Sequence, residues 1–247
     1  MRTVRGDVLC WILLGFASAL CAQNNPAASI KSNDTSHVTC GDNAAISRTV
    51  TSDIFVSPDD KRRAYARVVA RAVAGQANPE RIFAACVNNS SLFVGSNPGP
   101  FELVFLEEAT DIESGNSLEI VDWSADSRRL LLQLAQWQYG SPGVTRSPLV
   151  YQAEFGIFQQ PDLSRSFRKQ FGIDCSLEVR VAGYSADGKI VIETTPLTPE
   201  EEEVLAIPSC SRKTSQWVLI ISSESLTPLP ENPKIVRNAK LEPQPEK

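Results

Sequence analysis

Residues 120–129 read Ile-Val-Asp-Trp-Ser-Ala-Asp-Ser-Arg-Arg, an apolar run that leads into a Ser-Ala-Asp turn and two arginines. The pattern occurs again at 53–62 (Asp-Ile-Phe-Val-Ser-Pro-Asp-Asp-Lys-Arg) and at 181–190 (Val-Ala-Gly-Tyr-Ser-Ala-Asp-Gly-Lys-Ile). Ser and Asp side chains bond to nearby backbone amides in tight turns, and Pro presets φ there. Each segment therefore predicts the turn of a β-hairpin.

The sequences around these turns have the composition of strands. Asp60, Ser127 and Gly188 occupy the turn position that most needs a positive φ. A third strand is expected downstream of each hairpin, at 90–94, 147–151 and 215–219. A fourth is expected at 101–106, at 155–158 and, more weakly, at 224–229. One short helix is expected over about 199–206, because Thr198, Pro199 and Glu201 fit a capping box.

The serines of the three turns, at 57, 124 and 185, are spaced 67 and 61 residues apart. A repeat of that length with four antiparallel strands predicts an all-β domain over 37–229, built from about three propeller-like units. We place the units at about 40–110, 111–170 and 171–229. The array would be small or open, with room for one degenerate extra unit in the loops, and a β-sandwich is the alternative fold.

The hairpin motif resembles that of TolB-type β-propeller repeats in exported bacterial proteins, which are WD40-like in architecture. Residues 121–130 carry the best match, 184–189 the next, and 57–61 match in the turn only. The resemblance covers about 30 residues and implies a blade hairpin. It implies almost nothing about activity, and three units depart from propellers of about 4–8 blades.

The N-terminus predicts a secretory signal over residues 1–22. Arg2 and Arg5 give a basic start, an apolar run follows over 8–20, and small residues end the segment. Cleavage after Ala19 and cleavage after Ala22 both remain open. The mature protein is expected in the periplasm or outside the cell, with a flexible lead-in over 23–36 and no transmembrane segment. The proline-rich, charged residues 230–247 predict a disordered tail.

Four cysteines remain after the signal region, and an even number in an exported chain predicts two disulfides. Cys86 and Cys210 both precede a third strand, and Cys40 and Cys175 both precede the first strand of their unit. We therefore expect the pairs Cys40–Cys86 and Cys175–Cys210. No Cys-x-x-Cys pair is present and the single histidine is His37, so no metal site or cofactor is expected.

The composition excludes one class of partner. The formal net charge of the chain is −5, whereas a nucleic-acid-binding protein needs a basic stripe. The turn aspartates Asp59, Asp126 and Asp187 are interpreted as turn caps rather than as acids or metal ligands. Residues 200–203, four consecutive glutamates, are interpreted as a solvated helix face.

No catalytic residues emerge, since nucleophile elbows, phosphate loops and dinucleotide fingerprints are all missing. We expect a non-catalytic binding or scaffolding protein of the envelope, with a protein or glycan partner held by loops of the β domain. The candidate surface is the loop 138–146 with Trp137 and Tyr139, whereas Trp123 and Trp217 are assigned to the core. The alternative is an extracytoplasmic hydrolase that acts on carbohydrate or peptide through acidic residues.

Overall fold

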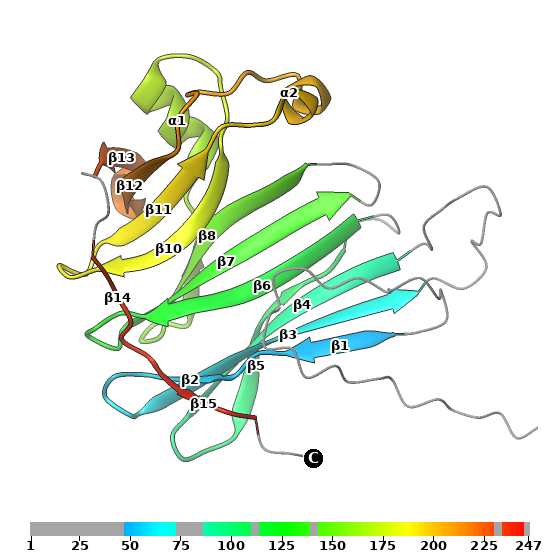
Figure 1. Ribbon diagram of the computed structural model, residues 1–247. Helices are drawn as coiled ribbons and strands as arrows, with labels where there is room; N and C mark the ends of the chain where they lie inside the picture. Colours follow the sequence, from blue (N-terminus) through cyan, green and yellow to red (C-terminus); the bar gives the residue numbers. More distant parts are fainter. Residues whose placement is uncertain (1–46, 73–85, 110–113, 139–142, 230–233, 245–247) are drawn as a thin grey trace, which may run out of the picture.

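A computed structural model describes residues 47–72, 86–109, 114–138, 143–229 and 234–244. These residues form three antiparallel sheets and two short α-helices, which confirms the predicted all-β class (Figure 1). The predicted signal and lead-in, residues 1–36, lie outside the described residues. No helix in the described ranges is long and apolar enough to cross a membrane.

The sheets follow one another along the chain. The first contains β1 (Arg48–Thr51), β2 (Ile54–Val56), β3 (Arg62–Ala72), β4 (Cys86–Ser96), β5 (Phe101–Glu107) and the late strand β15 (Lys240–Glu242). The second contains β6 (Ser114–Trp123), β7 (Arg129–Gln138), β8 (Val144–Gln152) and β9 (Ile157–Gln159). The third contains β10 (Glu178–Ser185), β11 (Ile190–Thr195), β12 (Ser215–Ile220), β13 (Ser225–Pro228) and β14 (Ile235–Val236).

Each sheet has the same four-stranded meander at its centre, β2 to β5, β6 to β9 and β10 to β13. The first hairpin of each meander closes at the predicted turn. In the second sheet, Ser124 N donates to the carbonyl of Arg129, while the Ser124 hydroxyl donates to Asp126 and accepts from Arg129 N. The turns at Ser57 and Ser185 repeat these side-chain bonds.

The predicted positive-φ positions are confirmed. Asp60, Ser127 and Gly188 have φ values of 57°, 61° and 77°. This left-handed conformation is easiest for Gly, so the two non-glycine residues depend on the capping bonds around them. The recurring aspartates are thus turn caps, as expected.

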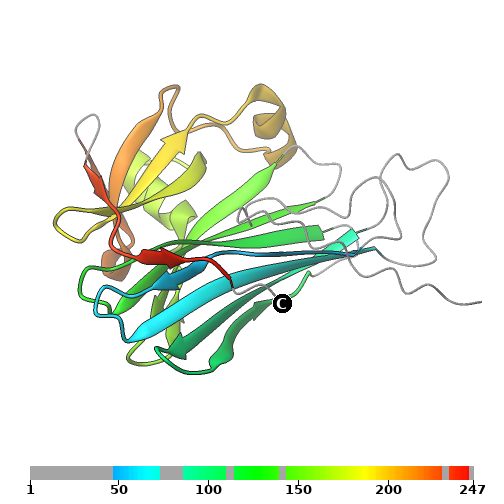
Figure 2. The ribbon, with the colours of Figure 1, turned by 60° about the horizontal axis from the view of Figure 1, so that its bottom comes forward.

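Two shared cores join the three sheets. Trp123 of β6 is fully buried, and its indole nitrogen donates to the carbonyl of Phe55 in the first sheet at 3.0 Å. On the other side of the second sheet, Gln133 of β7 accepts from the backbone nitrogen of Val181 in β10 at 2.8 Å. The second sheet therefore lies between the first and the third (Figures 1 and 2).

The C-terminal segment does not match the predicted disordered tail. Residues 234–244 cross all three sheets: β14 pairs with β10, and β15 pairs with β2. Between them, the backbone nitrogens of Asn238 and Ala239 both donate to the buried carboxylate of Asp122 at the end of β6. The segment therefore ties together the first strand of each meander (Figure 1).

Helix α2 (Pro199–Leu205) confirms the predicted short helix, with Thr198 as its N-cap and Glu201 completing the capping box. Helix α1 (Leu163–Phe171) was not predicted. It begins at the N-cap Asp162 and ends at Gly172, which takes the left-handed C-cap conformation. The fourth strand of the second meander begins two residues later than the predicted 155–158.

The predicted disulfide Cys175–Cys210 is present in the third unit. Its cysteines are 35 residues apart, and a cross-link that closes such a loop stabilises a fold by about 3–4 kcal/mol in the chain-entropy account. Cys40 lies outside the described residues, so its pairing with Cys86 stays a prediction. Cys86 is itself disulfide-bonded.

Candidate functional site

A cavity of about 440 Å³ lies between the second and third sheets, beside the end of β7 and the start of β8. Its walls come from β6, β7, β8 and β10 and from both helices. This volume falls within the range of about 300–1,000 Å³ that is common for small-ligand pockets.

Much of the cavity lining is apolar. Helix α1 contributes Leu163 and Phe167, and α2 contributes Val204 and Leu205. The strands and the segment before α2 supply the other apolar side chains, Trp137, Val144, Leu177, Val179 and Leu197. Val204 and Leu205 are 56% and 42% exposed, so part of this apolar lining is open to solvent. Such a lining favours an apolar side chain or ligand body as the occupant.

Trp137 does not lie on the open surface where the sequence placed it. It is buried, with 7% of its surface exposed, and it forms a wall of the cavity. Its indole packs over Gly115 of β6, where an added Cβ would lie 2.3 Å from the ring. Glycine at 115 is therefore required for this ring position. The other predicted surface residue, Tyr139, lies outside the described residues.

The polar residues of the lining carry more negative than positive charge. Glu108, Glu178 and Glu201 line the cavity together with Arg146. Arg146 forms an ion pair with Glu178, whose other oxygen accepts from the hydroxyl of Thr195 at 3.1 Å. With three carboxylates and one guanidinium, the cavity favours an occupant that carries a positive charge.

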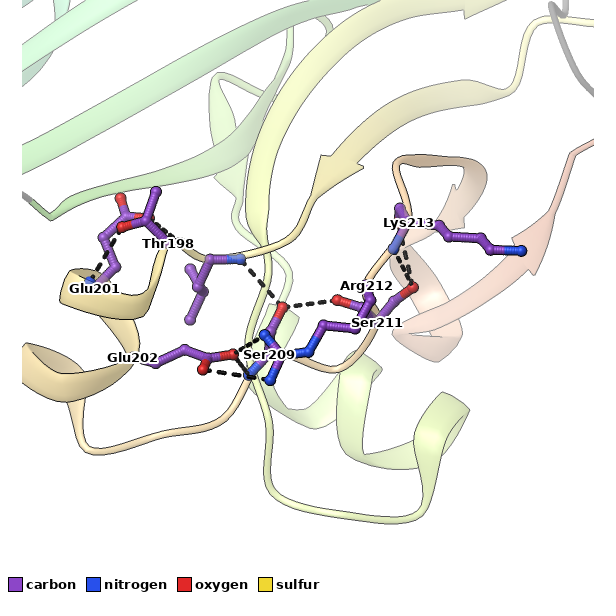
Figure 3. Close-up of polar contacts among 8 residues, drawn as sticks. Thr198, Glu201, Glu202, Ser209, Ser211, Arg212 and Lys213 are labelled. Atoms are coloured by element: carbon purple, nitrogen blue, oxygen red, sulfur yellow. Dashed lines mark hydrogen bonds and ion pairs between the residues drawn. The ribbon is translucent and has the colours of Figure 1, made fainter.

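Helix α2 is held in place by bonds at its own start. The Thr198 hydroxyl accepts from Glu201 N at 3.2 Å, and the Glu201 carboxylate accepts from Thr198 N at 2.8 Å (Figure 3). This reciprocal pair satisfies two backbone donors that a helix leaves free at its N-terminus. The Glu201 side chain is consequently occupied as a cap.

The segment after α2 is fixed by a second group of polar contacts. Glu202 accepts from Ser209 N and from the guanidinium of Arg212, both at 2.8 Å, and these bonds, the backbone one foremost, lower the pKa of its carboxyl (Figure 3). The Ser209 hydroxyl accepts from Leu197 N at 3.1 Å. With the adjacent disulfide at Cys210, these contacts make α2 a firm wall of the cavity.

The turn aspartates, which the sequence analysis considered as possible acids or metal ligands, do not form a reaction centre. In each hairpin turn, hydrogen bonds lower the pKa of the aspartate: from Ser57 to Asp59, from Ser124 to Asp126, and from Lys189 and Ser185 to Asp187. Within the part of the chain that the structure describes, no group of three metal-ligating side chains gathers. His37 lies outside that part.

Of the two predicted surface residues, Trp137 lines the cavity, and the cavity itself was not predicted from the sequence. The lining residues are scattered over about a hundred positions, from Glu108 to Leu205. One sequence signal was available: Val204 and Leu205 follow four glutamates in a short helix, and such apolar residues on an otherwise polar helix indicate a buried or bound face.

Comparison with models of protein families, with curated proteins and with solved structures finds no match to this chain.

Proposed function

We propose that this chain is an exported binding protein of the cell envelope or exterior, and that the cavity beside α2 is its recognition site. The fold would be an open, propeller-like array of three units, because each unit is a four-stranded meander closed by the same turn. Export is supported by the Cys175–Cys210 disulfide, since such bonds persist in oxidising compartments.

The single observation that carries the binding proposal is the apolar lining of the cavity, to which both helices contribute. A protein partner that inserts an apolar side chain next to Lys or Arg would match both the lining and its excess of carboxylates. A glycan is a poorer match, because sugars stack on exposed aromatic rings and Trp137 is buried against Gly115.

No observation favours the alternative, a hydrolase, over the proposed binding protein. Acid catalysis needs a carboxyl whose pKa is raised toward the working pH. The carboxyl pKa shifts found in the described ranges are all downward, as for Glu193 and Glu202, which have Arg180 and Arg212 as partners. Of the three cavity acids, Glu178 is engaged in an ion pair and Glu201 in a helix cap.

The test fills the cavity with a side chain and follows peptide binding. Thr145 is an exposed residue of β8 that lines the cavity, so Thr145→Trp should occupy the site without disturbing the core. The control is Thr227→Trp, at an exposed position of β13 away from the cavity. A displayed peptide library selected on the mature protein should yield sequences with an apolar residue beside Lys or Arg.

Affinity of the selected peptides should fall at least about tenfold, or about 1.4 kcal/mol, in Thr145→Trp and stay unchanged in Thr227→Trp. Equal binding to both variants would show that the cavity is not the recognition site.

A further inference from the structure

The first sheet has one face turned away from the second sheet. Even-numbered residues of β3, such as Ala64 and Ala66, are fully buried in the core shared with β6. Because side chains alternate along a strand, the odd-numbered residues face the other way. We call this the arginine face; it carries Arg63, Tyr65, Arg67, Val69 and Arg71 of β3 and their neighbours on β4 and β5.

Aromatic rings hold two of the arginines in place. The guanidinium of Arg67 lies 4.7 Å from the ring centre of Phe93, and that of Arg63 lies 4.9 Å from the ring centre of Phe101. Tyr65 stacks on Phe93 with 4.8 Å between centres. The Nε atoms of both arginines are buried without a hydrogen-bond partner. The charges are thus ordered and partly desolvated, as in protein interfaces.

These charges are not neutralised by the described residues. None of Arg63, Arg67 and Arg71 forms an ion pair with a described carboxylate. By strand register, Leu103 and Leu106 of β5 share the face, opposite Phe93 and Ser91, and they are 52% and 47% exposed. The face therefore combines positive charge with exposed apolar surface in a chain whose net charge is −5.

Helix α2 has the complementary chemistry. Its first turn is acidic and its last turn has no basic residue. Glu200 and Glu203 are exposed and form no ion pair with a described cation, and Val204 and Ile207 beside them are 56% and 39% exposed. In Figure 1 the helix lies above the second sheet, beside the third, and the first sheet lies below the second. Within one chain, the two surfaces do not meet.

We propose that a second copy of this chain docks its α2 on the arginine face. Glu200 and Glu203 would lie beside Arg67 and Arg71, and Val204 and Ile207 would cover Leu103 and Leu106. The contact joins two different surfaces, so it is heterologous, and association increases with protein concentration. Its charged contacts are separate from the proposed peptide site, because neither Glu200, Glu203 nor the arginine face lines the cavity. Val204 belongs to both, since it lines the cavity as well, so the test below changes only charged residues.

The experiment exchanges the charges between the two surfaces. One variant is Arg67→Glu with Arg71→Glu, and the other is Glu200→Arg with Glu203→Arg. Sedimentation equilibrium of the mature protein at low salt should give an average mass that rises with concentration. Each double variant alone should associate at least about tenfold more weakly, and an equal mixture of the two should recover the association. High salt should weaken the wild-type association, because exposed charges are screened.

Two results would overturn the proposal: a wild-type protein that stays monomeric at every concentration, or a mixture that does not recover association. Unfolding midpoints of each variant establish that it is folded. If the Arg67 change prevents folding, two single variants at exposed positions, Arg71→Glu and Glu203→Arg, replace the two double variants. Each is measured alone and in an equal mixture, and the same two results would overturn the proposal.

Discussion

At the residue scale, Asp122 is one of the side chains that hold the C-terminal segment. Its carboxylate is 1% exposed and accepts from the backbone nitrogens of Trp123, Asn238 and Ala239 at 2.8–2.9 Å. A buried carboxylate is tolerated only when its oxygens are hydrogen-bonded, and here backbone donors from two distant segments satisfy it.

Asp122→Ala should lower the free energy of unfolding by about 2–4 kcal/mol, because it leaves buried amide donors unsatisfied. Urea unfolding of the mature protein measures the loss. Asp174→Ala is the control, since its ion pair with Arg168 is exposed and should cost less than about 0.5 kcal/mol. Equal losses in the two variants would contradict this role for Asp122.

The turn aspartates make the stability of the protein depend on pH. Hydrogen bonds from Ser124 hold the pKa of Asp126 below its usual range in the folded state. A carboxyl with a depressed folded pKa contributes stability that is present above its unfolded pKa, about 3.9, and is lost as the pH falls through the folded pKa.

Asp126→Asn should therefore reduce stability near neutral pH by about 1 kcal/mol and flatten its decline between about pH 5 and pH 3. Urea unfolding midpoints across that range measure both effects. A variant whose midpoint declines as steeply with acid as the wild type would show that Asp126 is not one of the groups responsible.

At the element scale, the segment around α2 owes its order to cross-links rather than to a core. No residue of α2 is buried, and a seven-residue helix is too short to be stable alone. The disulfide, the capping box and the Glu202 contacts take the place of packing.

Cys175→Ser with Cys210→Ser should loosen this segment before the rest of the fold. We expect limited proteolysis to cut first within 199–213 and global stability to fall by about 3–4 kcal/mol. Mass spectrometry of the fragments locates the first cut. First cleavage within the strands of the second sheet would contradict the expectation.

At the scale of the whole molecule, the second sheet joins the first and third through shared cores. Its two faces belong to separate cores, one shared with the first sheet and one with the third. Residues 234–244 add a direct connection between the outer two sheets. Units that share cores in this way are expected to unfold together.

Tryptophan fluorescence tests this cooperativity. Trp123 reports on the contact between the first and second sheets, and Trp217 on the core of the third. The protein used begins after residue 22 and so lacks Trp11. In its Trp137→Phe background, Trp217→Phe leaves the first reporter and Trp123→Phe leaves the second. Each variant should give a fluorescence midpoint equal to its own midpoint by circular dichroism. A fluorescence transition that precedes the circular-dichroism transition would show that one sheet unfolds separately.

Features controlled by local chemistry could be predicted from the sequence. The Ser-x-Asp turns, their positive-φ residues and the capping box of α2 are set by neighbours within a few positions, so they could be read from the chain. The alternation of apolar residues likewise placed Trp123 and Trp217 in the core. The Cys175–Cys210 pairing followed from the matching places of the cysteines in the repeat.

Features that join distant segments could not be predicted from the sequence, because they depend on how the sheets and helices pack. Asp122 accepts hydrogen bonds from Asn238 and Ala239, which lie 116 and 117 positions later in the chain. These bonds hold the polar C-terminal segment against the sheets, where it forms strands. The burial of Trp137 depends on Gly115 in the neighbouring strand, and the cavity on helices from two different connections. Such contacts depend on how sheets and helices pack rather than on local propensity, and no pattern of neighbouring residues records them.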